Sequence, residues 1–113
     1  MHEMSLAEGI LQIIEDQLRT TSFDRVRTVI LEIGALANVE IEALRFAFEA
    51  VTRNSVADGA GLEIETVPGE GWCLECIRAV PLAAMFDACP QCGGYQVRVT
   101  GGTEMRVKEL AVD

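Results

Sequence analysis

The sequence is short of basic residues and of long apolar runs, and each shortage excludes a class of protein. Nine Lys and Arg stand against eighteen Asp and Glu, which gives a formal net charge of −9 at pH 7. Such an acidic surface repels phosphate, so we expect no binding to nucleic acid. No apolar run reaches the roughly 18 residues that a membrane span needs, and the basic start typical of a signal peptide is missing. The sequence therefore predicts a cytoplasmic protein with no place in a membrane.

Motifs for catalysis are missing as well. The chain has a single histidine, His2, and it offers no pairing of a nucleophile with a base. No glycine-rich phosphate loop of the form G-x-x-x-x-G-K occurs, so the protein is not expected to hydrolyse nucleotides. An acidic surface suits cations and basic protein patches instead. We therefore expect a binding protein, not an enzyme.

The 113 residues, half of them apolar, are enough for one small domain with a satellite. Ser5 to Glu8 has the form of a capping box, and the apolar spacing behind it predicts a helix over 5–20. Asn38 is a favoured N-cap residue and predicts the start of a second helix. Strands are predicted at 25–33, 62–67, 96–100 and 104–112. The expected fold class is α+β, with two helices packed on a small three-stranded sheet.

The composition changes at Pro68-Gly69, after which periodicity fades and all four cysteines follow. We expect one domain from 1–68 plus 99–113, and a zinc-ribbon-like domain over 69–98, inserted before the last strand. So small a segment cannot build a stable apolar core. It needs a bound metal to hold it together, and its exposed apolar residues Leu82, Met85 and Phe86 are expected to cover that site. The alternative is that these three residues form a docking surface for a partner.

The four cysteines form two C-x-x-C pairs, Cys73 with Cys76 and Cys89 with Cys92, twelve residues apart. Each pair can place two thiolates on one side of a tight turn, and two such turns facing each other make a tetrahedral site of four sulfurs. Bound Zn²⁺ can contribute roughly 10–16 kcal/mol of folding free energy in such peptides. A closed four-sulfur site leaves no position for a substrate, so the predicted zinc is structural.

Other interpretations of the cysteines remain open, among them four buried thiols that hold no metal. Disulfides are rare in the cytosol, and a redox-active C-x-x-C normally starts a helix in a thioredoxin-like unit. Iron competes more seriously, because Cys89 to Gly93 also resembles a rubredoxin turn and tetrahedral sulfur sites accept either metal.

The N-terminus gathers nitrogen donors within three residues. A histidine near a chain end is most often a solvated surface residue. Here, however, the Met1 amine, the backbone amides of His2 and Glu3, and the His2 imidazole lie close along the chain. Deprotonated amides favour a square-planar ion, which indicates Ni²⁺ or Cu²⁺ more than Zn²⁺.

Together these features resemble the HypA/HybF family of nickel chaperones in [NiFe]-hydrogenase maturation. The resemblance lies in the start Met1-His2-Glu3-Met4-Ser5-Leu6, in the spacing of the two cysteine pairs, and in the closing stretch Gly102-Thr103-Glu104-Met105-Arg106-Val107. It runs in order along the whole chain.

The resemblance implies a nickel-binding metallochaperone with two metal sites. Ni²⁺, its transient cargo, would be bound by His2 and Glu3, with Met1 as a further donor. Glu40 matches a position where some members use an acidic ligand. Zn²⁺ would be structural, held by the four cysteines. The implied partners are a HypB-type GTPase and the [NiFe]-hydrogenase large-subunit precursor.

Three other functions fit parts of the sequence. They are a zinc-stapled protein-interaction module, a rubredoxin-like iron protein without a nickel role, and a zinc ribbon that binds nucleic acid. The acidic balance of residues 69–98 argues against the last. The expected oligomeric state is a monomer or a homodimer, since an exchangeable terminal strand permits domain swapping.

Overall fold

The computed structural model describes residues 2–113, which divide into two compact units. The first comprises the described residues up to Leu31, with Val39–Ile64 and Val107–Asp113. The second comprises Glu32–Asn38 and Glu65–Arg106. The second unit is wider than the predicted insert 69–98, and the division of the chain into 1–68 plus 99–113 and 69–98 stays a prediction.

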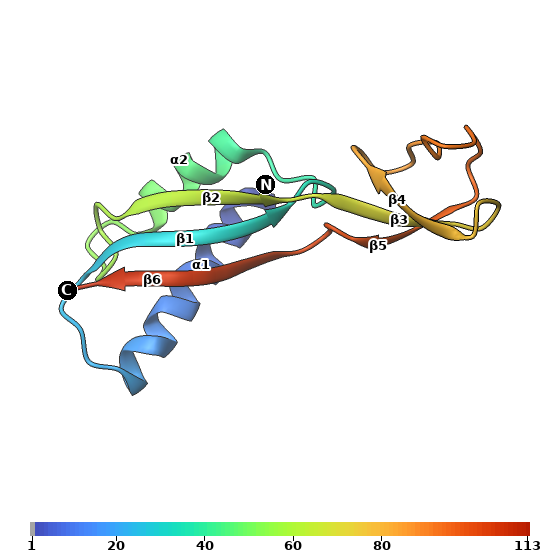
Figure 1. Cartoon of the computed structure of the whole chain (residues 1–113). Coiled ribbons are helices and arrows are strands. Elements are labelled where there is room, and N and C mark those ends of the chain that lie inside the picture. Colours follow the sequence, from blue (N-terminus) through green and yellow to red (C-terminus); the bar gives the residue numbers. More distant parts are fainter. Residues whose placement is uncertain (1) are drawn as a thin grey trace. The chain divides into compact units, whose positions relative to one another are not determined.

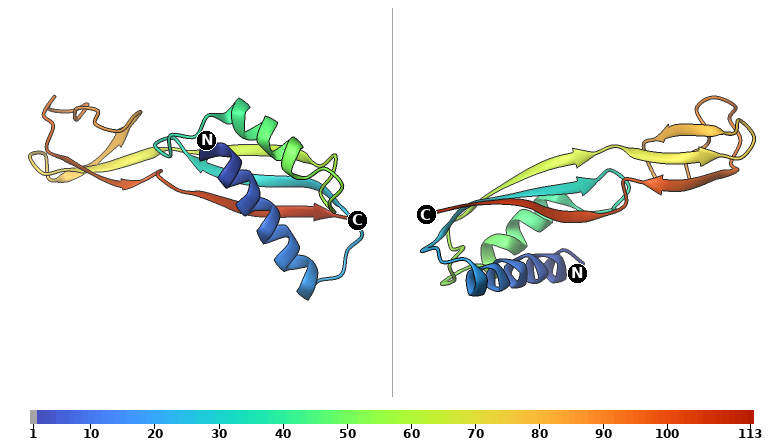
Figure 2. Two further views of the ribbon diagram at one scale, coloured as in Figure 1. Left: turned by 180° about the vertical axis from the view of Figure 1, so that it is seen from behind. Right: turned by 60° about the horizontal axis from the view of Figure 1, so that its bottom comes forward.

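The predicted α+β fold is confirmed, with two helices and two three-stranded sheets within residues 2–113. Helix α1 (His2–Thr20) and helix α2 (Ile41–Val51) pack against each other. They lie on one face of a sheet of order β2-β1-β6, as the right-hand view of Figure 2 shows. The strands of that sheet, labelled in Figure 1, are β1 (Val26–Gly34), β2 (Gly61–Val67) and β6 (Met105–Val112).

The core of the first unit comes from the apolar stripes of the helices and the inward face of β1. Ile10 and Ile14 of α1 are fully buried, whereas Ile13 and Leu18 on the flank of the predicted stripe are 44% and 38% exposed. Val29 and Leu31 alternate with less buried neighbours, as predicted for a strand with one covered face. Further members of this core are Ala7, Val26, Leu44, Ala47, Phe48 and Ala57.

No helix within residues 2–113 combines the length and apolarity that crossing a membrane would require.

Both helix starts differ from the predictions. Helix α1 begins at His2, not after Ser5, so Ser5 lies inside the helix and the predicted capping box is wrong. The acidic Glu3 in the first turn suits the positive end of the helix dipole and permits this earlier start. Helix α2 is capped by Glu40, whose carboxylate accepts from the Glu42 amide, whereas Asn38 adopts a left-handed φ of 56°.

The second sheet holds the cysteine-rich segment and is here called the ribbon. It consists of β3 (Gly69–Cys73), β4 (Arg78–Leu82) and β5 (Val97–Gly101) in the order β4-β3-β5, with antiparallel pairing. The predicted strand 96–100 pairs in this sheet as β5. Strands β3 and β4 were not predicted, because their glycines and a proline hide the alternation. In this sheet Cys73 of β3 lies opposite Arg78 of β4 on one side and Val97 of β5 on the other.

Three glycines allow the backbone to pack closely where the second unit enters the ribbon. A Cβ added at Gly34 would overlap the carbonyl group of Gly102, and one added at Gly102 would lie 2.6 Å from the Pro68 oxygen. The Cβ added at Gly102 would also lie 2.6 Å from the Gly69 Cα. Gly102 itself has a left-handed φ of 81°. The Leu36 amide donates to the Gly102 carbonyl at 2.8 Å, which fixes this close approach.

We expect Gly34→Ala to destabilise the protein by about 3 kcal/mol, the upper part of the range for an overpacked interior. The matched control is Gly9→Ala, because Gly9 lies mid-helix with nothing within 4 Å of the added Cβ. That change should stabilise by about 0.5–1 kcal/mol, since alanine restricts the unfolded chain. Urea unfolding of both variants measures the difference, and equal midpoints would contradict the crowding.

Candidate metal centre

The first cysteine pair lies in the turn between β3 and β4. Cys73 ends β3, and the next residues fold back tightly, so that the Ile77 amide donates to the Cys73 carbonyl at 2.8 Å. The Cys76 amide donates to the Cys73 sulfur at 3.3 Å. The local backbone thus places both sulfurs on one side of the turn, as predicted for a C-x-x-C pair.

The second pair forms a similar turn, closed by the corresponding backbone hydrogen bond. The Gly93 amide donates to the Cys89 carbonyl at 2.8 Å, and the Gln91 amide donates to the Cys89 sulfur at 3.4 Å. The Cys89 amide in turn donates to the Gly94 carbonyl at 2.8 Å, which closes the loop. We call the two turns, residues 73–77 and 89–93, the first and second knuckles.

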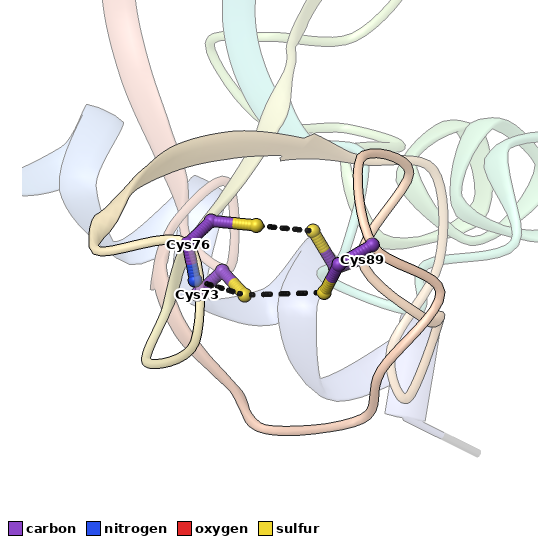
Figure 3. A group of neighbouring side chains, drawn as sticks. Cys73, Cys76 and Cys89 are labelled. Carbon is purple, nitrogen blue, oxygen red and sulfur yellow. Dashed lines mark hydrogen bonds between the residues drawn. The ribbon is translucent and has the colours of Figure 1, made fainter.

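The knuckles bring all four sulfurs within 4.8 Å of one another. The sulfurs of Cys73 and Cys92 are 3.8 Å apart, and those of Cys76 and Cys89 are 4.0 Å apart. Figure 3 shows the labelled side chains pointing toward one another. A tetrahedron with metal–sulfur bonds of about 2.3 Å has edges of about 3.8 Å. The four sulfurs therefore fit a tetrahedral ion with little movement, and none of the four is in a disulfide.

The centre is closed toward the ribbon core and open on one side. Cys73 and Cys89 are buried together with Leu82, Val80 and Leu36, Cys76 is half-buried, and Cys92 is exposed. Leu82 thus covers the centre as predicted. The same expectation is wrong for Phe86, which is 87% exposed, because the loop after β4 turns its side chain outward.

Hydrogen bonds give the thiols of Cys76 and Cys89 different pKa values. The backbone N–H groups of Cys92 and Gln91 donate to the Cys89 sulfur and lower the pKa of that thiol to about 7. The pKa of Cys76 is raised to about 12, first by its contact with the Cys73 sulfur and next by Cys92, since neighbouring sulfurs share a proton. A cation entering this site displaces protons, so its binding weakens as the pH falls.

The N-terminal candidates lie at the start of α1 and beside the start of α2. His2 is the first residue of α1 and is exposed, and Glu3 is half-buried. The Glu40 amide donates to the Glu3 carboxylate at 3.2 Å, although the two residues are 37 positions apart. Met1 lies outside the described residues. The structure thus brings Glu3 and Glu40 into contact through a hydrogen bond. Within residues 2–113, the four cysteines are the one cluster of three or more side chains that could together bind a metal ion.

Sequence reasoning placed Glu40 among the possible ligands but missed its role as the cap of α2. The side chain accepts from the Glu42 amide at 3.3 Å while its own amide binds Glu3. The signal was weak, because Asn38 has the stronger N-cap preference and stands only two residues earlier.

The link from Glu3 to Glu40 predicts a pH dependence. Donation by the Glu40 amide lowers the pKa of Glu3, so the contact persists at neutral pH and is lost as the pH falls through this lowered pKa. The Glu40 amide resonance, followed by NMR, should shift with a midpoint below that of an ordinary glutamate. Glu3→Gln should remove this transition, and a midpoint at or above the ordinary value would contradict the contact.

Comparisons with known proteins agree with this architecture. Residues 1–112 match the protein-family model described as hydrogenase/urease nickel incorporation, metallochaperone, hypA. The chain is similar to the hydrogenase maturation factor HypA of Azoarcus sp. strain BH72, with 64% identity over 112 residues that cover 99% of this chain and 98% of that protein. It is 65% identical to the protein of the same name from Albidiferax ferrireducens, over the full length of both.

Two solved structures have the same fold. The solution structure of a HypA protein superposes with a TM-score of 0.71 and 26% identity, over 99% of this chain and 96% of that one. The solution structure of the Ni metallochaperone HypA from Helicobacter pylori gives a TM-score of 0.70 at 24% identity, over 97% and 96%. At this identity the second likeness supports the fold alone.

Proposed function

Since this chain belongs to the HypA family of hydrogenase and urease nickel-incorporation metallochaperones, we propose that it carries Ni²⁺ at its N-terminus to a [NiFe]-hydrogenase large-subunit precursor. A metallochaperone binds and releases its cargo without a covalent step, and the protein is not an enzyme. The observation that carries the nickel proposal is the meeting of Glu3 and Glu40 at the end of α1 where His2 stands.

The first turn of α1 supports nickel binding by His2 and Glu3. The first amides of a helix have no carbonyl acceptor within the helix, so the amides of His2 and Glu3 can bind a cation in their deprotonated form without breaking the helical ladder. The Glu3 amide would then leave its own carboxylate, to which it now donates. The exposed His2 imidazole supplies a further nitrogen. Met1 would add its amine.

Carboxylates offset the unfavourable position of a cation at a helix N-terminus. The dipole of α1 repels a positive charge at its first turn, while Glu3 and Glu40 lie there with opposite charge. Ligation by Glu40 would require its carboxylate to leave the Glu42 amide that it caps. Glu40 is therefore the weaker of the two proposed carboxylate ligands. Such a site is accessible and easily dismantled, which suits a carrier that must release its cargo.

We assign Zn²⁺ to the four-cysteine metal site, with Cys73, Cys76, Cys89 and Cys92 as its ligands. The separations of the sulfurs fit the tetrahedral zinc–thiolate geometry. Zinc supplies the staple that joins the two knuckles, and it has no redox chemistry. Elemental analysis of purified protein should find one zinc per chain in a colourless solution. A red solution with iron would identify the rubredoxin-like alternative.

The proposed partners follow from the role in hydrogenase maturation. As the family resemblance implies, they are a HypB-type GTPase and the large-subunit precursor that receives nickel. The cysteines are free, as they must be to bind metal, and this supports work in the reducing cytoplasm.

A transfer experiment tests the proposed function. The nickel-loaded chain is mixed with purified large-subunit precursor, the proteins are separated, and the nickel on each is measured. We expect nickel to move to the precursor while zinc stays on the chain. Nickel that stays on the chain, with or without the GTPase and GTP, would contradict delivery.

A further inference from the structure

The two knuckles share a left-handed residue and a closing hydrogen bond at the same point, but the residues there differ. Ile77 follows Cys76, and Gly93 follows Cys92, each directly after the second cysteine of its pair. Both have a left-handed backbone, with φ of 55° at Ile77 and 75° at Gly93. Each donates its amide to the carbonyl of the first cysteine at 2.8 Å. The conformation is therefore a requirement of the knuckle and not of the side chain.

Glycine meets this requirement without strain, whereas isoleucine does not. A β-branched residue at positive φ is a true outlier, because its side chain crowds the backbone. Burial could compensate for the strain, but 73% of Ile77 is exposed. Neither the knuckle geometry nor the ribbon core explains an isoleucine here, which suggests a role outside the chain.

Ile77 has apolar neighbours that are exposed as well. Leu74 in the same knuckle is 52% exposed, and its amide donates to the Gln96 carbonyl at 2.9 Å. That hydrogen bond holds the knuckle beside Tyr95, which is 77% exposed. We call Leu74, Ile77 and Tyr95 the knuckle surface. Exposed apolar side chains grouped in this way typically mark a protein interaction site.

The segment that carries the knuckle surface is negative on balance, although Arg78 directly follows Ile77 and is exposed. Glu75 stands between Leu74 and Cys76, and its carboxylate lies 3.8 Å from the Cys92 sulfur. Residues 69–98 carry one net negative charge, and four thiolates around a divalent cation add two more. A second copy of this chain would bring another −9 and is repelled. The fitting occupant is a protein with an apolar cup ringed by Lys and Arg.

We propose that the knuckle surface docks into such a basic-rimmed apolar cup on a protein partner, with Ile77 as the central anchor. Buried apolar anchors contribute most of the binding energy of an interface, while the charged rim sets orientation and the rate of association. The choice of partners for the test rests on the proposed function, namely the HypB-type GTPase and the large-subunit precursor.

The test compares side chains at position 77 in the zinc-loaded full-length protein. Ile77→Asn keeps a side chain that tolerates left-handed φ but is polar, and Ile77→Leu stays apolar. Affinity for each purified partner is measured by calorimetry at two salt concentrations. We expect Ile77→Asn to weaken binding to at least one partner about tenfold or more, with zinc content kept and Tm unchanged or raised. Ile77→Leu should bind like wild type.

A control variant and the salt series complete the test. Phe46→Ala removes an equally exposed side chain from α2, 74% exposed, and should leave both affinities unchanged. Higher salt should weaken wild-type binding, since the cup is basic. If wild type binds a partner and Ile77→Asn binds it equally well, the docking surface is wrong while the proposed function stands. If wild type binds neither partner, both are overturned.

Discussion

Replacing Cys73 with serine is expected to abolish metal binding at the four-cysteine centre and to unfold the ribbon. Cys73 is fully buried, ends β3, and its sulfur lies 3.8 Å from that of Cys92. Serine removes one thiolate, and the three remaining sulfurs no longer close a tetrahedron. The free energy of metal binding to such a site, about 10–16 kcal/mol, exceeds what a small apolar cluster can replace.

Trypsin sensitivity measures this effect within the ribbon. Arg78 begins β4 and Arg98 lies in β5, and both are cleaved once the strands separate. We expect rapid cleavage at both sites in Cys73→Ser, while the circular dichroism of α1 and α2 persists. A chelator should reproduce this in wild type, and added zinc should reverse it there but not in the variant. A metal-free ribbon that resists trypsin would show that the ribbon folds without the bound metal.

A matched variant separates metal loss from general damage at the knuckles. Cys92 is the exposed ligand, and sites of three cysteines and one histidine also bind zinc. We therefore expect Cys92→His to keep zinc and trypsin resistance where Cys73→Ser loses both.

Replacing His2 with alanine is the second change with a large expected effect. It should abolish stoichiometric Ni²⁺ binding while the zinc content and the fold remain. His2 is the sole histidine and is exposed at the first residue of α1, so its loss removes the imidazole without opening a cavity. Alanine also favours the helix, which separates loss of a ligand from loss of structure.

Calorimetric titration with Ni²⁺, paired with elemental analysis, checks the His2 prediction. Glu40→Gln keeps an oxygen that can cap α2 while removing the charge, and its expected loss of affinity is smaller. Glu15→Ala, an exposed acid farther along α1, should bind like wild type. Unchanged nickel affinity in His2→Ala would overturn the N-terminal site.

The sequence was most informative where the determinant is local. The C-x-x-C spacing predicted the gathering of four sulfurs, because each pair lies within a single turn and needs only one facing turn. Apolar spacing predicted α1, since a one-sided stripe follows from burial on one face. The family resemblance is confirmed by the match over residues 1–112, whereas the metal ligands stay predictions.

The features that could not be predicted from the sequence depend on contacts between residues far apart in the chain. The hydrogen bond between Glu3 and Glu40 joins positions 37 residues apart and leaves no periodic signal. Strands β3 and β4 contain two glycines and a proline, so cross-strand pairing rather than propensity defines them. A left-handed backbone is ordinary for glycine, as at Gly93, whereas isoleucine gives no local sign of that conformation at position 77.

The antiparallel pairing of β3 with β5 makes the ribbon an exchangeable cassette. Glu70 lies opposite Gly101, so the chain leaves for the knuckles and returns from them on adjacent strands, about 4.8 Å apart. A hairpin of any protein offers the same pair of attachment points. Exchanging the knuckles for those of a relative would therefore join the chain at these two positions, and it would also have to match Leu36, which is buried with Cys73 and Cys89 but lies outside the exchanged segment.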